Sequence, residues 1–159
     1  MLGRTYDGQA CSLARALEVV GERWTLLIVR DALLGLRRYE QFSDSLGIAR
    51  NVLTDRLARL VGAGVLERVR YQQRPDRFEY RLTAMGEGLA LPVLSLMQWG
   101  DAHLAGPDGP PRLARHGDCG GEVRVGLTCA HCGRTAHEGV EIVPGPGAPP
   151  PPEPTAHTK

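Results

Sequence analysis

The sequence predicts an α+β fold that is mainly α-helical, with one small β-hairpin, followed by a short appendage rich in cysteine and histidine. Three observations lead to this fold class. Apolar residues recur at helical spacing from Leu13 to Leu60. Two short runs rich in Val, Leu, Tyr and Phe, at 65–71 and 78–83, then predict a pair of strands. Beyond them, three of the four cysteines of the chain lie within residues 116–132.

Four helices are expected before the hairpin, because each of four apolar stripes is followed by a residue that favours a helix end. The stripes lie at 13–20, 24–34, 39–46 and 50–60. Glycine readily takes the left-handed conformation in which many helices end. The glycines that follow the first three stripes are Gly21, Gly35 and Gly47, and Gly62 and Gly64 together end the fourth helix.

The hairpin and a last helix complete the domain. The six residues between the two strands, QQRPDR at 72–77, predict a basic tip that contains proline. Thr83 is placed to cap a long last helix, which carries apolar residues from Leu89 to Trp99. Pro92 lies inside this helix and should kink it, because proline lacks a backbone N–H and its ring clashes with the preceding turn.

Charge and composition narrow the class of protein further. The formal net charge is only +1, but residues 37–81 hold ten arginines against six acidic residues, a local charge of +4. The N-terminus lacks the layout of a signal peptide. The longest apolar run, at 89–97, is shorter than the ~20 residues of a membrane span. We therefore expect a cytoplasmic protein without a membrane partner.

The last three of these helices, the two-stranded hairpin and the closing helix follow the element order of a winged helix-turn-helix. Residues 41–60 would form the helix-turn-helix, and its second helix has the size that a DNA major groove admits. Arg and Asn suit bidentate contacts with bases, whereas arginines at the flanks and the hairpin tip suit the DNA backbone or the minor groove. The expected DNA-binding residues are Arg50, Asn51, Thr54 and Asp55 on the exposed helix face, Arg56 and Arg59 at its flanks, and Arg74 and Arg77 at the tip. A solvated helix face and an ordinary surface loop are the simpler alternative, against which the element order and the local charge both argue.

Three motifs, GERWT at 21–25, LTDRL at 53–57 and EYRLTAMG at 79–86, make the prediction specific. With them, the segment from Cys11 to Gly100 resembles the HxlR-type, MarR-like winged-helix transcriptional regulators. The resemblance implies a homodimeric repressor on an inverted-repeat operator in double-stranded DNA, released by a small-molecule, redox or electrophile signal. It also implies dimer contacts from the first and last helices, which here offer Leu13, Leu96, Met97 and Trp99.

One position departs from the family pattern at the start of the recognition helix. Ala49 stands where such regulators usually have a serine cap, and the loss of a cap of this kind costs ~1 kcal/mol. Asn51 is the alternative cap, a role that would remove it from base recognition.

The segment HGDCGGEVRVGLTCAHCG, at 116–133, has ligand spacing typical of a zinc site. His116 and Cys119 form one pair and Cys129 and Cys132 a second, and ligands two residues apart can bind one ion through a tight turn. The segment has few apolar side chains, so we expect one structural zinc ion per chain to hold it together. The nine-residue gap between the pairs is shorter than the usual ~15–20. A Cys129–Cys132 redox pair and a segment without function remain alternatives, with His137 as a substitute ligand.

Cys11 remains outside this set, at or near the start of the first helix. A helix N-terminus lowers the pKa of a thiol, and the thiolate is the reactive form. Members of the family sense electrophiles or oxidants through a cysteine in this place, which makes Cys11 the candidate sensor. The alternative is a small apolar residue buried at a dimer interface.

The domain boundaries and the exclusion of an enzyme complete the expectations. The chain divides into an arm (1–10), a DNA-binding and dimerisation domain (11–104), a linker (105–112), a zinc-ribbon-like segment (113–143) and a disordered proline-rich tail (144–159). No enzyme is expected, because phosphate-binding glycine loops and nucleophile triads are absent from the sequence. A zinc ion with four protein ligands has no open catalytic position. A protein-interaction adaptor that uses the zinc segment and the tail is the alternative, and it would coexist with DNA binding.

Overall fold

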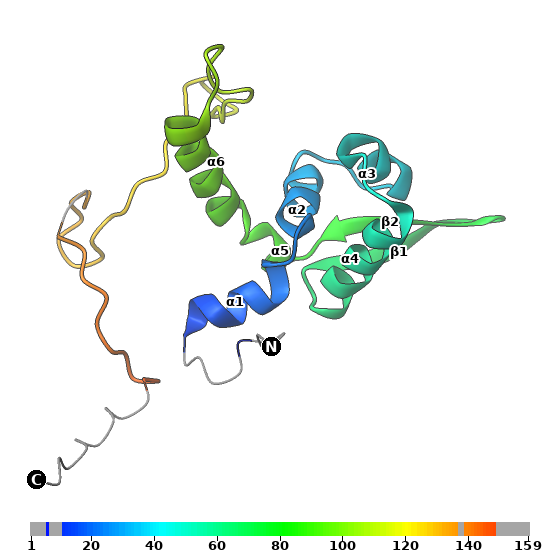
Figure 1. Cartoon of the computed structure of the whole chain (residues 1–159), viewed down its shortest axis with the longest axis horizontal. Helices are drawn as coiled ribbons and strands as arrows, with labels where there is room; N and C mark the ends of the chain where they lie inside the picture. The colour runs from blue at the N-terminus through cyan, green and yellow to red at the C-terminus, as the bar shows by residue number, and fades with distance from the viewer. Residues whose placement is uncertain (1–5, 7–10, 137–138, 149–159) are drawn as a thin grey trace, which may run out of the picture.

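The computed structural model describes residue 6, residues 11–136 and residues 139–148. The rest of the expected arm, His137 and the end of the proline-rich tail lie outside the described residues. Within the described part, the fold is the predicted winged helix-turn-helix (Figure 1). Its elements are α1 (Ser12–Val20), α2 (Thr25–Leu33), α3 (Tyr39–Leu46), α4 (Arg50–Gly62), β1 (Leu66–Gln73), β2 (Asp76–Leu82), α5 (Ala84–Glu87) and α6 (Ala90–Leu104).

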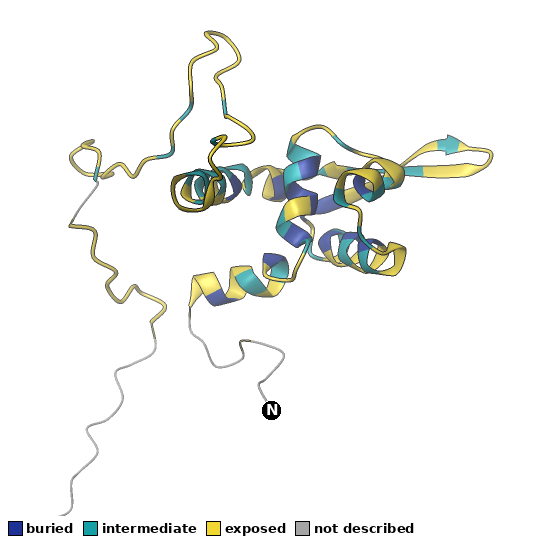
Figure 2. Ribbon diagram, turned by 45° about the horizontal axis from the view of Figure 1, so that its top comes forward, coloured by how far each residue is buried: buried dark blue, intermediate teal, exposed yellow. Residues whose placement is uncertain are grey.

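The hydrophobic core lies where α2, α3 and α4 meet the base of the hairpin (Figure 2). Phe42 of α3 and Leu53 and Leu57 of α4 are fully buried there, together with Ile28 of α2. The ring of Phe42 also packs edge-on against Tyr80 of β2, with 6.5 Å between the ring centroids. Full burial of each such side chain contributes about 1.5–3 kcal/mol to stability. The apolar stripes predicted for α2, α3 and α4 therefore supply the buried core residues, and the opposite face of α4 is left to solvent. The stripe predicted for the first helix is mostly exposed, and only Ala14 and Val20 of that helix are buried.

The helix-turn-helix is formed by α3, a short turn and α4. Gly47 ends α3 with a left-handed φ of 60°, and its N–H donates to the carbonyl of Ser43 at 2.9 Å. Ala49 is the N-cap of α4 and offers no side-chain hydrogen bond, as the sequence predicted. Asn51 lies inside the first turn of α4, so the alternative in which it caps the helix is wrong.

The hairpin, or wing, is longer than the sequence predicted. β1 and β2 pair antiparallel and leave only residues 74–75 between them. Four of the six residues assigned to the tip therefore belong to the strands. The outer part of the wing is held by backbone pairing and by the ion pair between Arg70 and Asp76, 3.5 Å apart. The prediction of the strands relied on apolar side chains, and the outer part of the wing is built from polar residues.

The long last helix expected from the sequence is divided in two. Thr83 caps α5 as predicted, because its hydroxyl accepts a hydrogen bond from the N–H of Gly86 at 3.2 Å. The chain then leaves the helix at Gly88 and Leu89 before α6 begins. Pro92 explains this break, since its ring would clash with the carbonyl four residues earlier, that of Gly88. The effect of proline is thus a break one turn upstream rather than a kink at Pro92, which lies in the first turn of α6.

Two helices, α1 and α6, project away from the winged helix and carry exposed apolar side chains (Figure 1). The exposed fractions are 66% for Leu13, 54% for Leu96 and 56% for Trp99. Met97 is half-buried and packs against the core, so it lies on the inner side of α6. No helix of the described part is long and apolar enough to cross a membrane.

Candidate DNA interface

The exposed face of α4 presents the residues that the sequence assigned to base recognition. Arg50, Asn51 and Thr54 are all exposed on the first turn and a half of this helix. Tyr39, at the start of α3, holds this end of α4 in place: its hydroxyl donates to the carbonyl of Arg50 at 3.0 Å and lies 3.3 Å from the Thr54 hydroxyl. The helix start, which has no side-chain cap, is therefore fixed by a tyrosine from the preceding helix. Sequence reasoning had assigned Tyr39 to the buried stripe of α3.

The three remaining residues expected on α4, which are Asp55, Arg56 and Arg59, all take part in ion pairs. Only 16% of the Arg56 side chain is exposed; its guanidinium pairs with Glu22 at 2.6 Å and donates to the carbonyl of Arg23 at 3.2 Å. Asp55 pairs with Arg59 at 3.0 Å on the same helix. As placed, Arg56 fastens α4 to the loop between α1 and α2, whereas Arg59 remains 58% exposed at the flank. Spacing along the chain does not indicate this long-range pairing.

The wing adds a second basic surface beside α4. Arg74 and Arg77 are exposed at its end, as predicted. Arg68, which the sequence analysis did not single out, lies over the ring of Phe78 at 3.6 Å. Such cation–π contacts hold guanidinium groups in defined positions. The wing thus offers more positioned positive charge than the tip alone.

A polar groove joins the wing to the start of α3. It has a volume of about 670 Å³ and is lined by Arg38, Arg68 and Arg77 among others. The guanidinium of Arg38 lies over the ring of Tyr71 at 5.0 Å, which bridges α3 and the wing. The sequence analysis counted Arg38 only as part of the local positive charge and did not assign it to a site.

Comparison with known proteins identifies the family of this fold. A model of the HxlR-like helix-turn-helix family matches residues 19–107, more than half of the chain. The chain belongs to the HxlR-like helix-turn-helix family. It is a DNA-binding transcriptional regulator of the helix-turn-helix type.

Other HxlR-like and related regulators cover more of the chain. An uncharacterised HTH-type transcriptional regulator of Mycobacterium tuberculosis is 48% identical over 148 residues, which span 92% of each chain. The crystal structure of PA1607, described as a transcription factor, has a TM-score of 0.77 and 36% identity, and the match covers 86% of this chain and 96% of that one. The redox regulator HypR, in its reduced form, has a TM-score of 0.55 and 29% identity over 58% of this chain and 92% of its own. None of the three is named as an enzyme.

Cys11 is the N-cap of α1 in this HxlR-like protein, the position expected for the candidate sensor. The thiol is fully exposed in the single chain. The backbone N–H groups of Ala14 and, to a lesser extent, Leu13 lower its pKa below the ordinary cysteine value. Because no capping hydrogen bond is formed by the side chain, this effect reflects the nearby N–H dipoles.

The two Cys/His pairs of the HxlR-like chain lie in two turns of matching construction. In the first, Cys119 Sγ is 3.4 Å from His116 Nδ1, and the N–H of Gly120 donates to the carbonyl of His116 at 2.8 Å. In the second, the N–H of Gly133 donates to the carbonyl of Cys129 at 2.8 Å. Both glycines have left-handed φ values, 69° and 71°. Each turn therefore has the shape of a two-ligand zinc knuckle.

The structure does not gather the two turns around a common centre. No group of three or more His, Cys, Asp or Glu residues is placed to share an ion within the described part of the chain. The fit to zinc is therefore one of two separate half-sites, each with exposed ligands. A shared ion would require the two turns to meet.

Proposed function

We propose that the protein is a repressor that binds a pseudo-palindromic operator as a homodimer and releases it in response to a chemical signal. The observation that carries this proposal is the exposed start of α4, where Arg50 and Asn51 stand beside a basic wing. Arginine and asparagine are suited to guanine and adenine edges in the major groove. The arginines of the wing suit the neighbouring phosphates.

A dimer is part of this proposal because a single recognition helix reads only one half-site. Two-fold related helices read half-sites about one helical turn, ~34 Å, apart. The exposed apolar residues of α1 and α6 support a dimer built on these two helices, since exposed apolar surface often marks a site of protein–protein contact.

The experiment that tests the function is selection of DNA. Purified protein is mixed with genomic fragments and excess competitor at several salt concentrations, and the retained fragments are sequenced. Enrichment of a motif with two-fold symmetry is expected. Equal retention of all fragments at every salt concentration would contradict sequence-specific binding.

Cys11 is the proposed receptor of the signal. Its thiolate adds to a ring carbon of a quinone and forms a C–S bond. One carbonyl oxygen takes up a proton from water, and the hydrogen of the attacked carbon moves to the other oxygen, which gives a hydroquinone thioether. Bulk added at the start of α1 would change the packing of the dimer helices. A shift of ~1.4 kcal/mol between two dimer geometries changes their ratio tenfold.

We expect a benzoquinone to lower operator affinity in the native protein and not in Cys11→Ser. The reaction should already proceed at pH values below the ordinary cysteine pKa, because the helix N–H groups lower the pKa of this thiol. Ser12→Ala, which changes the adjacent exposed residue of α1 and keeps Cys11, is the matched control and should respond like the native protein. Release of DNA while mass spectrometry shows Cys11 unmodified would instead favour a non-covalent inducer.

Zinc binding by the two turns is a second part of the proposal, supported by their matching geometry. We expect about one zinc ion per chain, bound by His116, Cys119, Cys129 and Cys132. Cys129→Ser should release the metal and make residues 113–143 sensitive to protease, with the winged helix still folded. Elemental analysis and limited proteolysis measure both effects; metal-free protein prepared without chelators would contradict zinc binding.

A further inference from the structure

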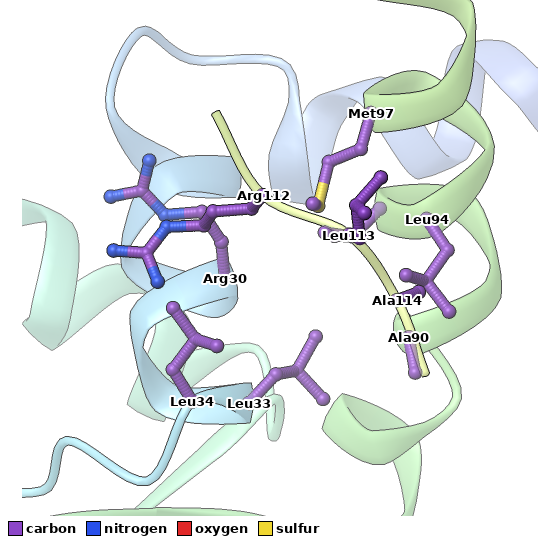
Figure 3. Close-up of a pocket in the computed structure, with 10 residues that line it drawn as sticks. Arg30, Leu33, Leu34, Ala90, Leu94, Met97, Arg112, Leu113 and Ala114 are labelled. Atoms are coloured by element: carbon purple, nitrogen blue, oxygen red, sulfur yellow. The ribbon is translucent and has the colours of Figure 1, made fainter. Parts of the chain in front are cut away.

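A cavity of about 440 Å³ lies between α2, α6 and the segment that follows α6 (Figure 3). Its walls are mostly apolar: Leu33 and Leu34 come from the end of α2 and its C-cap, Leu94 and Met97 from α6, and Leu113 from the following segment. The volume falls within the ~300–1,000 Å³ range of small-molecule sites, which are apolar with a few placed polar groups. The third wall comes from residues 112–114, beyond the last helix of the winged domain.

The third wall is fixed to α6 rather than loosely laid over it. The N–H of Val123 donates to the carbonyl of Ala114 at 2.9 Å, which pairs the wall with a second segment. The side-chain amide of Gln98 on α6 then bonds that second segment twice. Gln98 Nε2 donates to the carbonyl of Val123 at 2.7 Å, and Gln98 Oε1 accepts from the N–H of Val125 at 2.8 Å. The cavity is therefore part of the folded structure.

Two arginines give the cavity a positive end. Figure 3 shows the guanidinium groups of Arg30 and Arg112 side by side, at the same end of the cavity. Arg30 is bonded to Asp31 Oδ1 through Nε at 2.9 Å and Nη2 at 2.7 Å. Arg112 has no carboxylate within ion-pair distance among the residues that the structure describes. Asp31 therefore pairs with Arg30 alone, and it is not part of the cavity wall.

We propose that this cavity binds a small organic acid that has a flat or branched apolar body and one carboxylate. The body would lie against the leucines and Met97, and the carboxylate would accept charge-assisted hydrogen bonds from Arg112 and from the part of Arg30 that Asp31 leaves open. Carboxylates suit arginine because its N–H groups form a planar fork. Binding of the acid is independent of the proposed function, whereas its effect on DNA rests on it.

The position of the cavity links the acid to the rest of the molecule. One wall is α2, which packs against α3, α4 and the wing. The opposite wall is α6, which carries the exposed residues Leu96 and Trp99. A ligand held between the two helices fixes the winged helix relative to the proposed dimer helices. It would therefore favour one dimer geometry over another.

The test is isothermal titration calorimetry of the full-length protein with 2-naphthoate and with its uncharged analogue 2-naphthamide. We expect 2-naphthoate to bind once per chain and the amide to bind at least about tenfold more weakly. Arg112→Gln should lower the affinity for 2-naphthoate by about tenfold and leave the amide nearly unchanged. Arg124→Gln is the matched control, because Arg124 lies in the same segment, outside the cavity, with 81% of its side chain exposed. It should bind like the native protein.

A second variant fills the space instead of removing the charge. Ala114→Leu places extra bulk on the third wall and should weaken both compounds. The proposal is overturned if 2-naphthoate gives no heat at millimolar concentration, if acid and amide bind alike, or if Arg112→Gln and Arg124→Gln behave alike. Operator affinity measured with and without the acid separates the two proposals. If the protein binds naphthoate but no operator DNA, the proposed binding site is supported and only the proposed function is contradicted.

Discussion

Arg50→Ala should weaken operator binding by about 1–3 kcal/mol and relax the base preference at one position in each half-site. Arg50 opens α4 and is exposed, and the Tyr39 hydroxyl fixes the backbone from which its side chain extends. An arginine so placed reads guanine through two parallel hydrogen bonds in the major groove. Fluorescence anisotropy on a set of single-base operator variants measures both the loss and the change in preference.

Arg74→Ala is the matched control for this experiment, since it removes the same charge from the end of the wing. It should weaken all duplexes alike and reduce the salt dependence of binding, because a phosphate contact releases counterions without reading sequence. Equal loss of base preference in both variants, or in neither, would show that α4 does not read DNA through Arg50.

Leu96→Asp should convert the dimer into a monomer, or into an insoluble chain. Leu96 is 54% exposed on the outer side of α6, so in the single chain the aspartate can remain solvated. At a two-fold interface the substitution occurs twice, and each unpaired charge taken out of water costs several kcal/mol. Sedimentation velocity, with circular dichroism as a check on helix content, measures the result.

Leu127→Asp provides the control for this change. Leu127 is 60% exposed in the segment after α6 and is not among the residues of the proposed interface, so its replacement should leave the dimer intact. Leu96→Asp that sediments as a dimer would show that the interface lies elsewhere. In that case the apolar side chains of α1 and α6 would need another partner.

The features that the sequence predicted are those that rest on local pattern. The stripes of α2, α3 and α4 supply the buried core, Gly47 ends α3, Thr83 caps α5, and Cys11 lies at the N-terminus of α1. Each depends on residues within one turn or one helix, where spacing and conformational preference decide the structure.

The features that the sequence missed depend on contacts between distant residues. Arg56 resembles any exposed arginine of a helix until the fold brings it to Glu22. Tyr39 meets α4 only because the turn folds α3 against it. The outer wing has no alternation of apolar residues, so its backbone pairing could not be predicted from the sequence pattern. Whether the two Cys/His turns share one ion depends on their distance in space, which spacing along the chain does not determine.

The ion pair between Arg56 and Glu22 couples the position of the recognition helix, α4, to that of α1. Glu22 lies in the short loop that begins where α1 ends, and Arg23, whose carbonyl also binds Arg56, is its neighbour. In the proposed dimer, which is held by α1, a small rotation of α1 would move this loop. Because the loop is bonded to Arg56, the movement would tilt α4. The distance between the two α4 helices of such a dimer would determine the spacing of the half-sites that it can bind. In the proposed dimer, the ion pair that stabilises each winged helix would therefore also influence the half-site spacing of the operator.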